Sequence, residues 1–222
     1  MNETNGTGPG GHPLELLLAD DFFFAAHDDV SGKIRLTDRA VGLGLAAALL
    51  GELILFRKVT IQAGEVGVVD RRPVRDALVN GVLEEVIREP DTRPVRDWLR
   101  YFGRSAYELV GQRMVREGLV RVSETRRFRR SPGYRPVDLN SAAWPIVRVA
   151  QKLARQEPIV LPDIVLAGLI SATGLERYLR TEAVTDINEY KQHLIGGLPR
   201  PLRVLVAETE AAIGDAVLHH RM

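Results

Sequence analysis

The sequence contains no cysteine among its 222 residues, which excludes disulfide bonds, thiolate nucleophiles and cysteine-ligated zinc or iron–sulfur centres. It also lacks a long uninterrupted apolar run. The longest such stretch, Ala40–Phe56, contains Glu52 and three glycines and falls short of the ~20 apolar residues that a transmembrane helix needs. Residues 1–11 are polar and lack the apolar segment of a secretory signal. These absences predict a cytoplasmic protein.

A strong net charge is absent as well, because the formal value is +1. The charges are nevertheless distributed unevenly. Residues 100–155 hold 12 Arg and 1 Lys against four acidic residues, which gives this segment +9 and leaves −8 for the rest of the chain. A basic segment in a nearly neutral chain indicates a localised anionic partner. Of the 30 basic residues 26 are arginine, and this composition favours a high-GC bacterial genome as the source.

The hydrophobic pattern predicts a mainly α protein: a compact helical bundle of about eight to ten helices with one or two small β-hairpins. A disordered leader is expected over residues 1–12, followed by a single domain over residues 13–222. The strand-like runs form hairpins at 59–69 and at 119–137, the second one projecting and basic. Helices are expected at 14–26, 43–56, 73–88, 95–102, from a Ser105–Glu108 capping box to Gly118, and at 141–156, 162–174, 175–194 and 202–219.

Two motifs invite a catalytic or cofactor interpretation. Residues Gly42–Ala47 fit a loose dinucleotide-binding pattern, but no strand precedes them, and small residues for helix packing explain them better. The second motif is a group of four aspartates and one histidine close together near the N-terminus, called the acidic group below. Its spacing fits no known set of metal ligands, and its side chains are expected to be solvated beside a turn. No nucleophile, metalloprotease or phosphate-loop signature is present, so the sequence predicts no enzymatic activity, metal or cofactor. The members of the acidic group are Asp20, Asp21, His27, Asp28 and Asp29.

The basic hairpin carries the strongest functional signal. Guanidinium groups make bidentate contacts to phosphate, and an aromatic side chain can enter a lipid interface or contact a second copy of the chain. Attraction to an anionic bilayer is worth ~1 kcal/mol per arginine. Phe128 and Tyr134 are the candidate membrane-inserting or self-association residues. The candidate headgroup-binding arginines here are Arg121, Arg126, Arg127, Arg129, Arg130 and Arg135.

One interpretation of this hairpin is a flexible loop whose charge serves only solubility. Three functional interpretations remain open beside it. It could bind anionic phospholipid headgroups at a membrane surface, or pair with a neighbouring subunit in a homo-oligomer. Nucleic-acid binding is the least favoured of the three, because no helix-turn-helix or RNA-binding signature accompanies the arginines.

The order of the segments resembles the Golgi phosphoprotein 3 family, in its bacterial branch, from about Leu14 to His219. The resemblance is carried by LELLLADD, by GLAAALLGELIL with the following Arg57–Lys58, and by VVDRRP and PVRDWLRYF. It continues through LVGQRMVREGLVRV and LPDIVLAGLISATGL. None of these segments is a catalytic signature, and their order carries the match.

The resemblance implies a compact helical fold with a projecting hairpin that supports self-association. Eukaryotic members of the family bind phosphatidylinositol 4-phosphate on Golgi membranes and link glycosyltransferase tails to coat proteins. Their headgroup pocket consists of a Trp and three Arg, which correspond here to Thr37, Ala46, Arg104 and Tyr107. Only Arg104 keeps the family residue. The resemblance therefore implies a non-enzymatic peripheral membrane or adaptor protein at the inner face of the cell membrane, with Arg104 as a further headgroup-binding residue.

Overall fold

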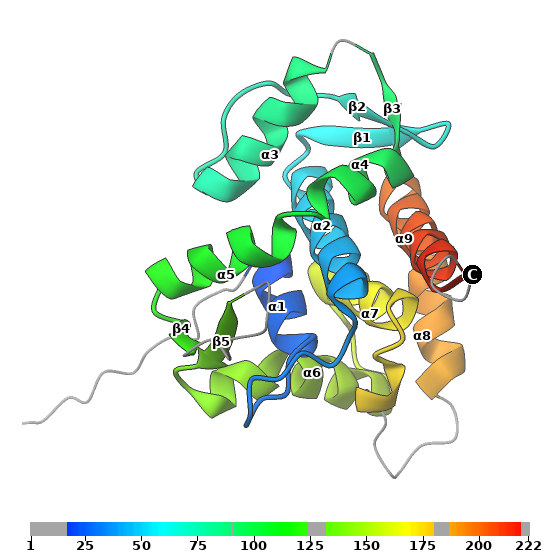
Figure 1. The fold of residues 1–222 in the computed structure, drawn as a ribbon. Coiled ribbons are helices and arrows are strands. Elements are labelled where there is room, and N and C mark those ends of the chain that lie inside the picture. The colour runs from blue at the N-terminus through cyan, green and yellow to red at the C-terminus, as the bar shows by residue number, and fades with distance from the viewer. Residues whose placement is uncertain (1–16, 90, 124–131, 180–186, 219–222) are drawn as a thin grey trace, which may run out of the picture.

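The computed structural model describes residues 17–89, 91–123, 132–179 and 187–218 (Figure 1). The expected leader at 1–12 lies outside these ranges. The mainly α prediction is confirmed. Within the described ranges the strands are β1 (Val59–Gln62), β2 (Glu65–Val68), β3 (Arg93–Pro94), β4 (Val120–Ser123) and β5 (Gly133–Pro136). The helices there are α1 (Leu18–Ala25), α2 (Asp38–Leu55), α3 (Ala77–Arg88), α4 (Val95–Phe102), α5 (Ala106–Arg116), α6 (Leu139–Ala154), α7 (Leu161–Ala172), α8 (Ile187–Gly196) and α9 (Arg200–Leu218).

Helix α2 forms the centre of the molecule and packs against α1, α4, α5, α7 and α9 (Figure 1). Its small residues make this packing possible. A Cβ atom on Gly42 would lie 2.2 Å from the carbonyl oxygen of Gly103, and one on Gly44 would lie 2.2 Å from the Phe22 ring. These glycines therefore serve close helix packing, as the sequence favoured, and not a nucleotide phosphate.

Two small antiparallel sheets lie at different ends of this helical core (Figure 1). The first has the order β1-β2-β3, and its hairpin turns at Ala63 and Gly64, which both have positive φ as a type I′ turn requires. The pattern predicted this hairpin but not β3, because a two-residue strand that contains Pro94 has no alternation to read. The second sheet is the β4–β5 hairpin.

Two local expectations are corrected. The Ser105 side chain does not cap α5: its hydroxyl instead lies 3.5 Å from the carbonyl oxygen of Phe102, although the helix still begins at Ala106. The helix expected at 175–194 is interrupted. A 3-10 turn covers Glu176–Tyr178 and α8 begins only at Ile187, with residues 180–186 outside the described part. In the described residues, no helix combines the length and the apolar character needed to cross a bilayer.

Candidate functional site

The base of the β4–β5 hairpin is held between two helices. Helix α5 ends at Arg116, and Gly118, with φ +72, permits the turn into β4. On the other side, the Asp138 carboxylate caps α6 by accepting hydrogen bonds from the backbone N–H groups of Asn140 and Ser141. Both arms of the hairpin are therefore fixed by the helices that flank them.

Arg121 on β4 and Arg135 on β5 lie directly opposite each other in the antiparallel register, and both are exposed. Side chains opposite each other in such a pair have Cβ atoms about 5 Å apart, and like charges there repel. Neither guanidinium forms an ion pair with an acidic residue of the described part. An anion placed between the two guanidinium groups would relieve the repulsion and accept hydrogen bonds from several of their N–H groups at once.

Tyr134 does not take the role expected of it. The sequence predicted a membrane-inserting or self-association residue, but the Tyr134 side chain is only 3% exposed. Strand alternation turns it to the face opposite Arg135, where its ring packs edge-on against Phe23 and Tyr107. Gly111 of α5 makes room for the ring, since a Cβ atom there would lie 2.3 Å from it. Tyr134 therefore anchors the hairpin to the core.

His27 completes this aromatic cluster and ties it to the second arm of the hairpin. Its Nδ1 donates to the carbonyl oxygen of Phe23 at 2.6 Å, which leaves Nε2 as the acceptor facing the Tyr107 hydroxyl at 3.3 Å. The same hydroxyl lies 3.3 Å from the carbonyl oxygen of Pro132. Burial lowers the pKa of His27 to about 4, so the imidazole is neutral at pH 7.

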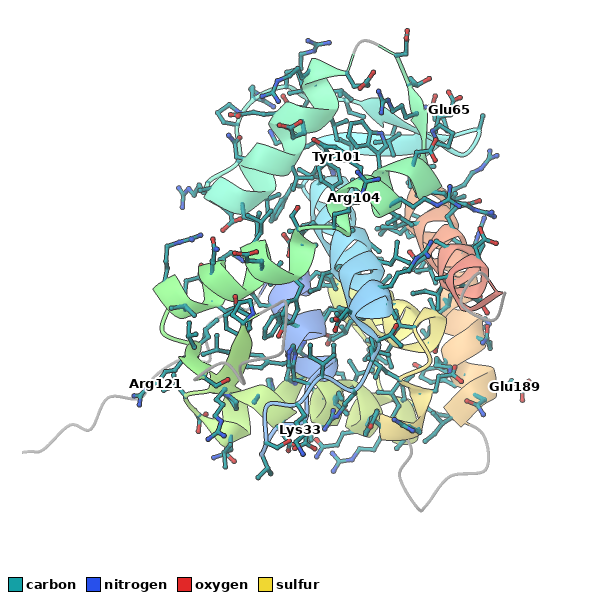
Figure 2. All side chains as sticks on the ribbon, viewed as in Figure 1. Lys33, Glu65, Tyr101, Arg104, Arg121 and Glu189 are labelled. Carbon is teal, nitrogen blue, oxygen red and sulfur yellow. The ribbon has the colours of Figure 1, made fainter. Side chains whose placement is uncertain are left out.

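Three of the four positions that correspond to the family's headgroup pocket therefore have structural roles. Thr37 caps α2 by accepting from the Ala40 backbone N–H, Ala46 is fully buried, and Tyr107 belongs to the aromatic cluster. Arg104 is exposed at the junction of α4 and α5 (Figure 2). Helix α5 separates it from Arg121, which lies on the hairpin at the edge of the molecule, so the two residues do not form one site (Figure 2).

The candidates in the sequence between β4 and β5, together with the acidic residue between them and Arg121, fall outside the described residues. They are Glu124, Arg126, Arg127, Phe128, Arg129 and Arg130.

The acidic group is not a solvated cluster, contrary to expectation, because Asp20 and Asp21 are buried. The Arg113 guanidinium donates to Asp20 Oδ1 at 2.8 and 3.1 Å and to Asp76 Oδ1 at 3.1 Å. The Arg148 Nη2 atom similarly lies 2.7 Å from Asp21 Oδ2 and 2.7 Å from Asp163 Oδ1. Two cations of the basic segment are thus neutralised inside the fold, while Arg121 and Arg135 remain available at the surface.

A third buried acid joins this network. Glu52 Oε1 accepts the backbone N–H of Ala19 at 2.7 Å, and Oε2 lies 3.7 Å from Arg113 Nη1. Desolvation by burial raises the pKa of Glu52 to about 8, and it raises the pKa values of Asp20 and Asp21 to about 6. The folded state therefore binds protons more tightly than the unfolded chain does.

This difference predicts how stability depends on pH. Because the folded pKa values are raised, the free energy of unfolding should fall as the pH rises from 6 to 9, by at least about 1 kcal/mol, since one pKa unit corresponds to ~1.4 kcal/mol. Glu52→Gln keeps an acceptor for the Ala19 N–H but cannot ionise, so its stability should change less over this range. Urea denaturation at both pH values measures the effect. An equal fall in the free energy of unfolding between pH 6 and pH 9 for the two proteins would contradict it.

A groove of about 590 Å³ lies between α3 and α5, beside the end of α4. Arg104 lines one end, and Leu78, Val82 and Leu109 supply apolar walls. Figure 2 shows Tyr101, another lining residue, close to Arg104 at the junction of α4 and α5. The sequence could not indicate this groove, because its walls come from helices that no motif connects.

An exposed apolar surface at the start of α6 was also missed. Val137 and Leu139 directly follow β5 and are 46% and 51% exposed, and the Trp144 side chain on α6 is 42% exposed. Trp144 shares its helix face with Asn140, Val147 and Gln151 at helical spacing, and two apolar side chains beside polar ones on this face are the signal that could have revealed it.

The family model described as Golgi phosphoprotein 3 matches residues 18–217. No curated protein matches the chain. In the described part of the chain, no group of three or more acidic, histidine or cysteine residues is arranged to hold a metal ion.

Proposed function

Because the chain belongs to the Golgi phosphoprotein 3 family, we propose that it is a non-enzymatic peripheral membrane or adaptor protein that docks on anionic lipid headgroups through its basic hairpin. The family suggests a lipid-binding or adaptor role in general. The proposed ligand is an anionic membrane surface, at the inner face of the cell membrane, and not phosphatidylinositol 4-phosphate alone. This choice follows from the core roles of Ala46 and Tyr107, which leave Arg104 as the one remaining pocket arginine.

The observation that carries the proposal is the Arg121–Arg135 pair. Two exposed arginines face each other across a hairpin, without an acidic partner in the described part of the chain. A protein that needed only solubility would gain nothing from this repulsion. A phosphate headgroup between the two guanidiniums would accept charge-assisted hydrogen bonds from both. The four arginines at 126, 127, 129 and 130, in the segment that joins β4 to β5 in the sequence, would add to the attraction.

The apolar surface at the start of α6 gives the docked protein a second contribution. Trp side chains favour the membrane–water interface, where the ring is apolar and its N–H can reach water. Val137 directly follows β5, Leu139 begins α6, and Trp144 lies on the second turn of that helix; all three are exposed. In this proposal the arginines provide attraction to the headgroups and these side chains provide shallow insertion.

Co-sedimentation with vesicles that contain phosphatidylglycerol tests the arginine pair. The double variant Arg121→Glu, Arg135→Glu should bind at least about 30-fold more weakly, since the loss of ~1 kcal/mol per arginine already corresponds to that factor.

The matched control is Arg71→Glu, Arg75→Glu, which removes two exposed arginines from the loop between β2 and α3 and leaves both strands of the β4–β5 hairpin unchanged. It has the same net charge as the test variant and should retain most of the binding. Equal losses in the two variants would show that only overall charge matters and would overturn the proposed site.

A further inference from the structure

The groove between α3 and α5 has an apolar interior and a cation near each end. Leu78 and Val82 of α3 face Leu109 of α5 across it. Arg104 precedes α5 and Arg116 ends it, so the two Cα atoms are about 18 Å apart along the helix, at 1.5 Å per residue. The groove therefore runs along α5, with largely apolar walls and an arginine near each end.

Gly81 is the residue that leaves this groove open. It lies inside α3, where glycine costs roughly 1 kcal/mol relative to alanine. Its φ is not positive, and no heavy atom lies within 4 Å of where its Cβ would be. Neither backbone conformation nor close packing requires a glycine there, unlike at Gly42 and Gly44. The absence of a side chain at Gly81 leaves the groove wider than any other residue would.

The charges at the rim are complementary to an anion. Neither Arg104 nor Arg116 forms an ion pair with an acid of the described part. The acid that lines the groove, Glu85, is already engaged: it accepts from Arg88 at 2.5 Å and from the Tyr101 hydroxyl at 3.2 Å. The positive charge of the two arginines is thus left for a ligand.

The size of the groove favours a thin ligand over a folded one. A volume of about 590 Å³ lies within the roughly 300–1,000 Å³ of small-molecule sites. A three-turn helix, about 10 Å across and 16 Å long, would need roughly twice that volume. A single extended acyl chain can enter fully between the apolar walls.

We propose that this groove binds one acyl chain of an anionic membrane lipid, with the lipid's headgroup phosphate on Arg116 and the chain extending past Leu109 towards Phe102. Arg116 is the rim cation nearer the hairpin, since β4 begins four residues after it. A lipid held in this way keeps its headgroup on the side that meets the membrane. The inference rests on the proposed function, because a docked bilayer supplies the lipid.

The test uses lysophosphatidylglycerol, an anionic single-chain lipid, below the concentration at which it forms micelles, so that no bilayer is present. Isothermal titration calorimetry should show saturable binding with one lipid per chain. Gly81→Leu should weaken it at least tenfold, because the new side chain fills the open groove. The same variant should unfold at a higher temperature, since leucine favours a helix, and should bind phosphatidylglycerol vesicles as the parent protein does.

Two controls keep the result specific. Gly214→Leu makes the same change inside α9, at an exposed glycine that also has no atom within 4 Å of the added Cβ, and it should bind the lipid normally. Arg116→Gln should remove the preference for lysophosphatidylglycerol over zwitterionic lysophosphatidylcholine. Equal loss in the Gly81 and Gly214 variants, or an unchanged preference in the Arg116 variant, would overturn the inference.

Failure of this inference can be told apart from failure of the proposed function. A parent protein that sediments with anionic vesicles but does not bind the monomeric lipid overturns the groove assignment and leaves the hairpin proposal standing. Native mass spectrometry of the purified protein gives a further check. A retained lipid mass that disappears in Gly81→Leu supports the assignment, whereas a peptide mass that disappears in the same way overturns it.

Discussion

Replacing Arg113 by methionine is expected to lower the free energy of unfolding by about 3–5 kcal/mol, the usual cost of removing one partner from a buried ion pair. Arg113 is 1% exposed and connects three helices through carboxylates. It donates to Asp20 of α1 and to Asp76, which also caps α3 by accepting the backbone N–H of Val79 at 2.8 Å. Without the guanidinium, Asp20 would remain buried without its cation, and the half-buried Asp76 would lose the same partner.

Urea denaturation at pH 7 measures this loss, and Arg116→Met on the same helix is the control. Arg116 is exposed, so its replacement should change the free energy of unfolding by less than about 0.5 kcal/mol. Adding Asp20→Asn to Arg113→Met should restore part of the loss, because the amide does not need a positive partner. A loss below about 1 kcal/mol in Arg113→Met would contradict the role assigned to this network.

Reversing the four arginines at the hairpin tip is expected to abolish binding to anionic vesicles. The variant changes Arg126, Arg127, Arg129 and Arg130 to Glu. At ~1 kcal/mol per arginine, removing four favourable contacts corresponds to roughly a thousandfold, and the introduced carboxylates add repulsion. Binding of the parent protein should also weaken steeply with salt, because the Debye length shortens from about 10 Å at 0.1 M to 3 Å at 1 M.

Co-sedimentation with phosphatidylglycerol vesicles measures this effect, and circular dichroism shows whether the variant keeps its helices. Unchanged binding by a folded variant would remove the tip from the proposed site. Loss of binding together with a matching loss in Arg71→Glu, Arg75→Glu would instead indicate a nonspecific effect of net charge.

The sequence predicted those parts of the fold whose signals are local. Periodicity and turn residues located α4, α9 and the β1–β2 hairpin, because each depends on neighbours within one short segment. The missing N-cap at Ser105 shows the limit of this reasoning. The residue pattern of a capping box was present, but the turn from α4 directed the Ser105 hydroxyl towards Phe102 instead. The start of α5 was therefore correct although its expected cause was not.

The candidate site was predictable only in outline. The arginine content of the hairpin is visible in the sequence, and so is the position of Arg121 and Arg135 in two strand-like runs. Burial depends on partners far away along the chain. Arg113 meets Asp20 across 93 residues, so nothing local distinguished this internal arginine from the exposed ones. The inward side of Tyr134 likewise depends on the space that Gly111 leaves on α5.

The most direct test of the membrane-docking claim is co-sedimentation of the unmodified protein at physiological salt with three sets of vesicles. One set is neutral, one contains phosphatidylglycerol, and one contains phosphatidylinositol 4-phosphate at matched charge. Emission from the exposed Trp144 provides a second readout, because Trp98 is buried at 4% exposure. We expect equal binding to both anionic sets with a blue shift of the emission, and no binding to neutral vesicles. Binding to none of the three sets would contradict the account.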